Sequence, residues 1–213
     1  MKPARKRIAD IISLLRKSYP RSHTALRYTT PFQILIATIL SAQCTDKRVN
    51  KITPSLFKKY RTVYDFARAR RTSLEQEIRS TGFYRNKAKN IISASKRIVK
   101  DFNGKVPDTM KELISLSGVA RKTANIVLSS GFKKTEGIAV DTHVKRLSAR
   151  LGLSREKNPD KIERNLLNIV PRKDWLDFNY MMVDHGRGVC NARKPLCVKC
   201  PLNRLCPSNR FKK

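Results

Sequence analysis

The chain has 213 residues, of which 47 are Lys or Arg and 16 are Asp or Glu, so its formal net charge is 47 − 16 = +31. Such a surplus favours a polyanionic partner, nucleic acid ahead of an anionic membrane surface; a thermophile's charged surface, the alternative, usually mixes both signs. With 40% apolar residues the chain can form a core without a disulfide scaffold, and no stretch approaches the length of a membrane span.

The N-terminal segment is basic, but its apolar stretch at residues 8–15 is interrupted by Asp10 and Ser13, so we do not expect a signal peptide. A nuclear localisation signal at residues 2–7 is an alternative, although a chance match is favoured in so basic a chain. We therefore expect a cytoplasmic, nucleoid-associated protein, or a nuclear one if the host is a eukaryote.

Helical signals recur along the whole chain, and no alternating apolar run is long enough for a convincing sheet, so we predict an all-α fold. Thr30 and Pro31 fit the cap and first turn of a helix whose residues 34–40 are apolar nearly all round. Such a helix is expected at the centre of the fold.

Two further motifs, Thr72-x-x-Glu75 and Thr109-x-x-Glu112, have the spacing of capping boxes at helix starts. Residues 88–102 repeat apolar positions at helical spacing, which predicts one amphipathic helix.

Residues 131–137, GFKKTEG, are predicted to form a loop between two helical groups. We expect two helical lobes with a cleft between them, the usual place for a substrate pocket. Residues 23–133 are expected to form a six-helix, barrel-like domain, and residues 1–22 plus 134–213 a second helical domain.

Residues 113–131, LISLSGVARKTANIVLSSG, predict a helix, a tight turn at residues 117–120 and a second helix beginning near Arg121, which is a helix-hairpin-helix. The low bulk of Gly118 and Ala120 would let backbone N–H groups at the helix N-terminus reach a phosphate oxygen. An ordinary αα-hairpin with a glycine turn is the structural alternative.

Lys122 lies in the first turn of that second helix, where the helix dipole and Arg121 disfavour an ammonium ion. As a free amine it is a candidate nucleophile that forms a Schiff base with a sugar carbon, whereas simple contact with phosphate is the structural alternative. Asp141 begins a later helix and is a good N-cap. If it also faces Lys122 across the cleft, its charge would stabilise positive charge on a sugar ring as the base departs.

Four of the five cysteines follow the spacing C-x6-C-x2-C-x5-C near the end of the sequence: Cys190, Cys197, Cys200 and Cys206. This clustering indicates metal rather than disulfides, and the single C-x-x-C favours an iron–sulfur cluster while leaving zinc open. The loop contains cations such as Arg193 and Lys194 and no acidic residue, so we expect it to touch DNA phosphates. Cys44 stands apart and is expected to be a small buried apolar residue.

The segments LSAQCTDKRVN, GFYRNKAKNI, LSGVARKTANIV and AVDTHVKRL, with the cysteine spacing, resemble the endonuclease III family of helix-hairpin-helix DNA glycosylases over residues 31–206. The resemblance implies excision of oxidised pyrimidines from duplex DNA, cleavage of the abasic strand, and a [4Fe–4S] cluster on the four cysteines. It places Lys122 at the catalytic lysine, whose Schiff base precedes β-elimination of the 3′ phosphate, and Asp141 at the catalytic aspartate. Related adenine-mismatch glycosylases lack this lysine, so its presence favours a lyase.

The hairpin departs from the family pattern Leu-Pro-Gly-Val-Gly at two positions, Ser117 and Ala120. A methyl group at Ala120 would crowd the phosphate, or cost about 1 kcal/mol if the φ angle there were positive.

The resemblance also assigns residues to reaching the base, because chemistry on a base in duplex DNA requires extruding its nucleotide. Gln43 matches the residue that enters the vacated space, and Phe83 matches a wedge between bases; helix capping and core packing are the respective alternatives. Arg85, Lys87 and Lys89 are expected to bind phosphate or to form a solvated face.

Further DNA contacts are expected from Gly118, Val119 and Ala120 of the hairpin, and from His143, which matches a pocket position but has a structural alternative. Residues 184–187 are expected to order the junction before the cysteines. The expected partner is double-stranded DNA with damaged bases or abasic sites, bound by a monomer without a membrane.

Two competing hypotheses belong to other classes of protein. A non-catalytic iron–sulfur module that recognises distorted duplexes would leave Lys122 and Asp141 without a role. A zinc-stabilised RNA-binding protein would explain the charge but make the hairpin-to-aspartate arrangement a coincidence.

Overall fold

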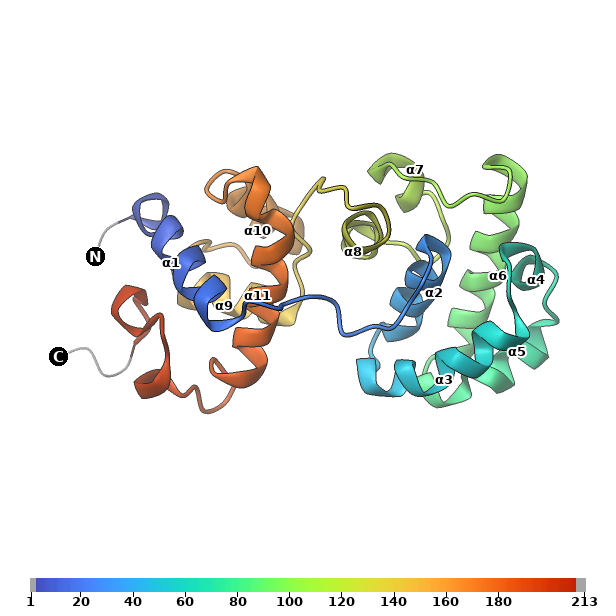
Figure 1. Ribbon diagram of the computed structural model, residues 1–213, viewed down its shortest axis with the longest axis horizontal. Coiled ribbons are helices and arrows are strands. Elements are labelled where there is room, and N and C mark those ends of the chain that lie inside the picture. The colour runs from blue at the N-terminus through green and yellow to red at the C-terminus, as the bar shows by residue number, and fades with distance from the viewer. Residues whose placement is uncertain (1–2, 210–213) are drawn as a thin grey trace. The chain divides into compact units, whose positions relative to one another are not determined.

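A computed structural model describes residues 3–209, and within this range the chain is helical and contains no strand, which confirms the all-α prediction. The chain divides into two compact units, residues 24–136 and the residues before 24 together with those from 137 onward (Figure 1). The predicted boundaries were 23–133 and 1–22 plus 134–213. The basic run at residues 2–7 begins outside the described residues, and no described helix is long and apolar enough to span a membrane.

The unit of residues 24–136 is built around one apolar helix. Residues 34–40 of this helix, α2, are all buried, and α2 packs against α3, α6 and α8. Thr30 caps it, since its Oγ1 accepts a hydrogen bond from the backbone N–H of Gln33 at 3.2 Å, so the predicted central helix is confirmed. Seven α-helices, where six were expected, make up the unit: α2 (Pro31–Ser41), α3 (Asp46–Lys59), α4 (Val63–Ala67), α5 (Arg71–Ile78), α6 (Tyr84–Asp101), α7 (Met110–Ile114) and α8 (Arg121–Phe132).

Only one of the two predicted capping motifs stands at a helix start. Thr109 caps α7 by accepting a bond from the N–H of Glu112, but the Glu112 carboxylate accepts from the Thr109 hydroxyl at 2.7 Å, so only half of the predicted capping box is formed. The prediction for Thr72 is wrong, because α5 begins at Arg71 and Thr72 lies inside it. Glu75 instead accepts a hydrogen bond from Arg71 Nε at 2.7 Å, an i,i+4 pair on the helix surface.

The predicted loop at residues 131–137 is partly helical, because α8 continues to Phe132. Gly131 explains the difference. A Cβ atom there would lie 3.2 Å from Pro31 Cα and 3.2 Å from Ile34 Cγ2 of α2. This glycine therefore serves the close approach of two helices rather than a turn.

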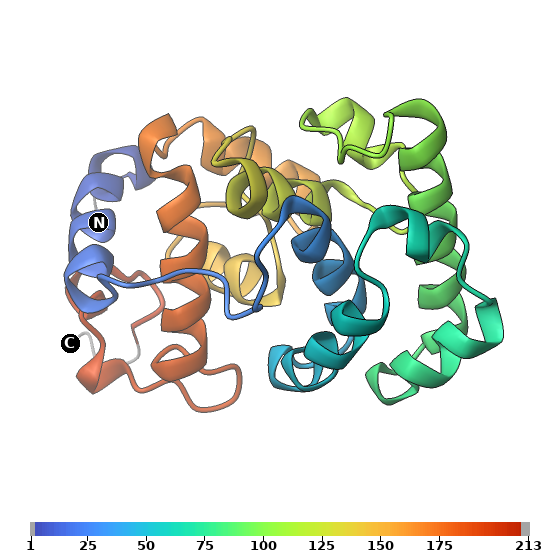
Figure 2. The same ribbon diagram turned by 45° about the vertical axis from the view of Figure 1, so that its right-hand side comes forward.

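The second unit has its own hydrophobic core, to which the N-terminal helix contributes Ile8, Ile11, Ile12 and Leu15. The segment with the four cysteines follows its last helix, and Figure 2 shows the path of this segment from a second direction. The unit comprises α1 (Ala4–Ser18), α9 (Thr142–Arg150), α10 (Pro159–Leu167), α11 (Trp175–Gly188) and the 3-10 turns η2 (Arg172–Asp174), η3 (Cys197–Lys199) and η4 (Asn203–Leu205).

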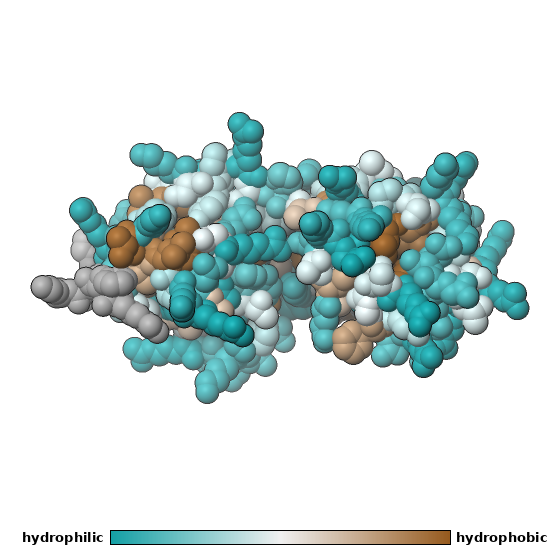
Figure 3. All heavy atoms as spheres, turned by 90° about the horizontal axis from the view of Figure 1, so that it is seen from below, coloured by the Kyte–Doolittle hydropathy of each residue, from teal (hydrophilic) through white to brown (hydrophobic). Residues whose placement is uncertain are grey.

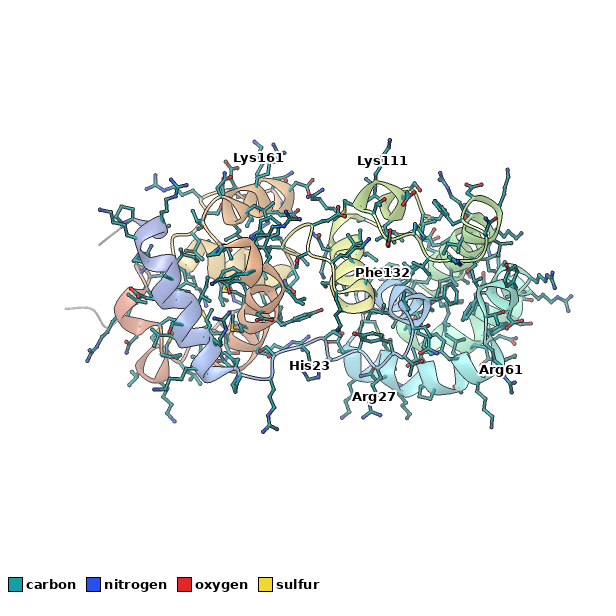
Figure 4. All side chains as sticks on the ribbon, turned by 45° about the horizontal axis from the view of Figure 1, so that its top comes forward. His23, Arg27, Arg61, Lys111, Phe132 and Lys161 are labelled. Atoms are coloured by element: carbon teal, nitrogen blue, oxygen red, sulfur yellow. The ribbon has the colours of Figure 1, made fainter. Side chains whose placement is uncertain are left out.

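Hydrophilic side chains cover most of the face shown in Figure 3, and hydrophobic residues appear there only in small separate areas. Arg61, Lys111 and Lys161 are exposed and extend away from the ribbon in Figure 4. Because the acidic residues can neutralise at most 16 of the 47 cations, the surface keeps a large positive surplus. This field attracts polyanions over roughly a Debye length, about 8 Å at physiological salt.

Candidate functional site

The predicted helix-hairpin-helix is confirmed as α7, a turn and α8. Gly118 has φ +78°, and a Cβ atom there would lie 2.9 Å from Asn90 Cβ, so the turn requires glycine at this position. Ala120, by contrast, caps α8 in extended backbone with φ −88°, so its methyl group causes no backbone strain. Ser117, which replaces the family's proline, links the turn to α6 by a hydrogen bond of 2.8 Å between its Oγ and that of Ser93.

Lys122 is exposed and is the second residue of α8, immediately beyond this turn. It stands at the end of the helix where backbone N–H groups and the helix dipole attract anions. Val119 is different, because its side chain is only 6% exposed and its N–H already donates to the carbonyl oxygen of Leu116 at 3.2 Å. Val119, which was predicted to contact DNA, is therefore chiefly a packing residue of the hairpin.

Asp141 is the N-cap of α9, as its alternative interpretation predicted. Its Oδ1 accepts a hydrogen bond of 2.8 Å from the N–H of Val144, which fixes the orientation of the half-buried carboxylate. Lys122 belongs to the unit of residues 24–136 and Asp141 to the other unit. Their action on one sugar therefore stays a prediction.

The opposite end of α9 holds the segment with the cysteines. Arg146 Nη2 donates to the carbonyl oxygens of Gly186 at 2.9 Å and of Cys190 at 3.0 Å. Arg150 Nη1 donates to Cys190 Sγ at 3.2 Å and to the carbonyl oxygen of Asn191 at 2.7 Å. Sequence reasoning placed Arg146 on the helix after Asp141 without giving it a role and missed Arg150; their i,i+4 spacing in AVDTHVKRLSAR is the signal that links them.

His143 is half-buried between α9 and α11, with Nδ1 at 3.2 Å from Arg146 Nη2. A Cβ atom at Gly186 would lie 2.7 Å from the same Nδ1, so the ring packs closely against α11. These contacts give His143 a structural role, and its predicted contact with DNA stays a prediction.

The four predicted ligands line one cavity of about 260 Å³, which also has Arg150 and His185 in its wall. Among residues 3–209 no group of three or more His, Cys, Asp or Glu side chains is placed to hold a single metal ion. Four cysteine thiols in the wall of one cavity match the number of ligands that a [4Fe–4S] cluster takes. Soft thiolate donors are also the ligands that iron–sulfur clusters use, so these residues fit such a group.

Residues 184–187 order this junction, as predicted. His185 Nε2 lies 3.4 Å from Cys200 Sγ, and its Nδ1 lies 3.0 Å from Tyr19 Oη of the chain segment after α1. Ser22 Oγ donates to Asp184 Oδ2 at 2.5 Å. Burial raises the pKa of the Cys200 thiol to about 11, so this cysteine must lose a proton when it becomes a metal ligand.

The cationic loop is exposed at Arg193 and Lys194, and also at Lys199 and Arg204, so all four cations are accessible to a phosphate backbone.

The prediction that Cys44 is a buried residue is only partly correct. This cysteine is half-buried at the edge of the first core rather than enclosed in it.

The two residues assigned to opening the duplex are both exposed on strained backbone. Gln43, just beyond α2, has φ +53°, and Phe83, just before α6, has φ +47°. Phe83 is 63% exposed, so its alternative interpretation as a core residue is wrong. Positive φ at residues other than glycine is uncommon and concentrates at functional sites.

The predicted phosphate contacts on α6 divide into two kinds. Arg85 is exposed, with its guanidinium carbon 5.7 Å from the centre of the Tyr84 ring, and Lys89 is exposed as well. Lys87 cannot bind phosphate, because it is only 4% exposed. Its Nζ donates to the carbonyl oxygens of Leu40 and Thr81, each at 2.8 Å.

Residues 36–172 match the family described as HhH-GPD superfamily base excision DNA repair protein. With the hairpin and its adjoining lysine, this match defines the class: a helix-hairpin-helix enzyme of base excision repair.

Relatives that match nearly the whole chain are named endonuclease III. The one from Synechocystis sp. is 52% identical over 208 residues, covering 98% of this chain and 95% of the relative. The one from Bacillus subtilis is 43% identical, covering 94% and 92%. A solved structure of a trapped covalent intermediate of endonuclease III with DNA matches with a TM-score of 0.93 and 42% identity, covering 98% of each chain.

The chain therefore belongs to the endonuclease III family. It is accordingly a DNA glycosylase with lyase activity at abasic sites.

Proposed function

We propose that Lys122 is the nucleophile of this activity and that the substrates are oxidised pyrimidines in duplex DNA. One observation carries the assignment: a turn that requires glycine at Gly118 opens onto α8, whose first turn presents Lys122 to solvent. A phosphate held by the N–H groups of this turn would bring the neighbouring sugar to the lysine amine.

The reaction needs Lys122 as the free amine. Its lone pair forms a bond to the sugar C1′ while the C1′–N bond to the base breaks, and the departing base takes that electron pair and a proton. Opening of the sugar ring leaves an iminium Schiff base on Nζ. Loss of a proton from C2′ then expels the 3′ phosphate by β-elimination, and water hydrolyses the imine to restore the lysine.

Asp141 is assigned to the charge that this reaction develops. As the base departs, the sugar becomes positive, and a carboxylate held in place stabilises that charge without having to reorganise. The capping bond to Val144 uses one carboxylate oxygen and keeps the group fixed. Gln43 is assigned to the space that the extruded nucleotide leaves in the duplex, and Phe83 is assigned to the wedge between neighbouring bases.

Cys190, Cys197, Cys200 and Cys206 are proposed to hold a [4Fe–4S] cluster, which when bound cross-links the segment around the cavity that they line. The four cysteines would then keep the loop with the exposed Arg193 and Lys194 in place to bind DNA phosphates. We propose a monomer that acts on chromosomal DNA, in keeping with the surplus of cations.

Borohydride trapping on duplex DNA with one abasic site tests the assignment of Lys122. The full chain should give a covalent adduct, which Lys122→Gln should lose along with strand cleavage while duplex binding stays within about threefold. Lys111→Gln is the control, because it removes one exposed cation from the adjoining helix α7. Cleavage by Lys122→Gln at the rate of the unmodified chain would refute the assignment, and binding without an adduct in the unmodified chain would favour a non-catalytic module.

A panel of duplexes carrying oxidised pyrimidines, uracil or mismatched thymine tests the substrate class. We expect the oxidised pyrimidines to be excised at least about tenfold faster than the others, a difference of about 1.4 kcal/mol. A preference for uracil or mismatched thymine would overturn that class while leaving the role of Lys122 intact.

A further inference from the structure

Lys87 is a buried lysine in a chain whose other lysines are largely at the surface. It lies in the first turn of α6 and is 4% exposed. Burial of the amine lowers the pKa of Lys87, because the charged form loses its hydration. An apolar side chain would fill this place without that cost, so the position calls for the hydrogen bonds that the amine makes.

The partners of Lys87 are two backbone carbonyls that precede the two strained residues. Leu40 lies in the last turn of α2, where carbonyl oxygens lack a partner within the helix, and Gln43 follows three residues later. Thr81 ends the 3-10 turn η1 (Arg79–Thr81), and Phe83 follows two residues later. Lys87 Nζ donates to both carbonyls at 2.8 Å.

A third bond connects the same lysine to the second loop. The backbone N–H of Lys87 donates to the carbonyl oxygen of Phe83 at 3.0 Å. Lys87 is therefore bonded to the carbonyl oxygens of Thr81 and Phe83 in one loop, and to that of Leu40 at the end of the helix that leads to Gln43. Without the amine, the carbonyls of Leu40 and Thr81 would both lose a buried donor, and the left-handed backbone beyond them would lose its support.

We infer that Lys87 is a positioning residue that ties the loop of Gln43 to the loop of Phe83 and sets the spacing at which both side chains enter the opened duplex. The inference rests on the proposed function, which assigns these two side chains to the space left by the extruded nucleotide. Lys87 touches no DNA itself. It acts through two exposed residues whose backbone it holds.

Lys87→Met tests the inference, because methionine is similar in length and apolar and provides no donor. Lys96→Met is the matched control, since it removes a cation from an exposed position of the same helix. Two rates separate positioning from general damage: excision from duplex DNA, and cleavage of a preformed abasic site in single-stranded DNA, which has no partner strand to open. We expect Lys87→Met to slow duplex excision by about 10- to 100-fold and single-strand cleavage by less than about threefold. An equal loss in both assays, or no loss in either, overturns the inference.

A mutant cycle adds a readout that a merely structural role would not give. In a Gln43→Ala, Phe83→Ala background, the residues through which Lys87 acts are gone, so adding Lys87→Met should slow duplex excision by less than about threefold. A further loss as large as that in the unmodified chain contradicts the inference. Should Lys87→Met fail to fold, Lys87→Arg keeps the donors and the charge but has a longer, forked head that displaces the loops. The same selective loss is then expected, and a parallel loss or none counts against the inference.

A fluorescence measurement keeps this inference separate from the assignment of Lys122. The probe is a duplex with 2-aminopurine opposite a tetrahydrofuran abasic analogue, whose emission rises when the purine is unstacked. In the Lys122→Gln background no chemistry is needed, and the rise on saturation should be largely lost on adding Lys87→Met but not Lys96→Met. A full rise with Lys87→Met overturns the positioning role, whatever the trapping experiment shows for Lys122.

Discussion

Replacing Gly118 by alanine measures how strictly the hairpin turn specifies its backbone. The φ angle of +78° is unfavourable for alanine by about 1 kcal/mol. The added Cβ would also lie 2.9 Å from Asn90 Cβ, and overpacking of this kind costs about 1–3 kcal/mol. We therefore expect Gly118→Ala to lower the free energy of unfolding by about 2–4 kcal/mol.

Two other glycines separate the cost of backbone strain from the cost of overpacking. Gly82 has φ +70° and no atom within 4 Å of an added Cβ, so Gly82→Ala should cost about 1 kcal/mol. Gly188 is helical with equally open space, so Gly188→Ala should be neutral or stabilise by up to about 1 kcal/mol. Urea unfolding followed by circular dichroism gives all three values. If Gly118→Ala proves no more costly than Gly82→Ala, the contact with Asn90 does not constrain the turn.

The same substitution should weaken binding to an abasic duplex, because a displaced turn misdirects the N–H groups offered to phosphate. Loss of one hydrogen bond to a charged group corresponds to about 1.5–3 kcal/mol, or roughly 10- to 100-fold in affinity. Fluorescence anisotropy at fixed salt measures this loss, with Gly188→Ala as the control. Unchanged affinity of a folded Gly118→Ala variant would remove the hairpin from the binding surface.

Asp141→Asn should change the free energy of unfolding by less than about 0.5 kcal/mol, because asparagine caps helices as well as aspartate does, yet it should slow base excision at least about tenfold. Asp141→Ala should also slow excision, and it should lower the free energy of unfolding by about 1 kcal/mol more because the cap is lost. Urea unfolding and single-turnover excision separate these effects, and full activity of Asp141→Asn would remove the carboxylate from the reaction. Cys197→Ser should reduce the iron content and the absorbance near 400 nm, and it should increase trypsin cleavage at the cations of the loop. The slope of log affinity against log salt concentration should become shallower by about 0.9 for each phosphate that the loop no longer binds. Unaltered proteolysis and affinity after iron loss would show that the cysteines do not hold the loop.

Sequence patterns predicted the elements whose signals are local. The cap and first-turn proline of α2, the glycine turn of the hairpin and the N-cap at Asp141 all depend on neighbouring residues, and all three are confirmed. Helix N-caps were harder to predict where several neighbouring polar residues could each take the cap position. Thr62 and Asp65 form a complete capping box on α4 that sequence reasoning missed, while Thr72 lies within a helix. Short helices give too little periodicity to decide between such starts.

The residues that sequence could not place are those whose partners are far along the chain. Lys87 looks like one cation of a surface run until its distance to Leu40, 47 residues earlier, is known. Gly131 reads as a loop residue until α2 is seen against it. Arg150 reads as a surface cation but reaches Cys190, 40 residues later. Tertiary contacts of this kind leave little trace in local composition.

The division of the chain has a consequence for its synthesis on the ribosome. Helix α1 is made well before its packing partners, because the residues that pack with Ile11 and Leu15 lie at 138–202. The compact unit of residues 24–136 is translated in the meantime, while the apolar face of α1 lacks its partners until residues 138–202 have been made. At about 5–20 residues per second that interval is roughly 10 to 40 s, during which this face is open to chaperones and to aggregation.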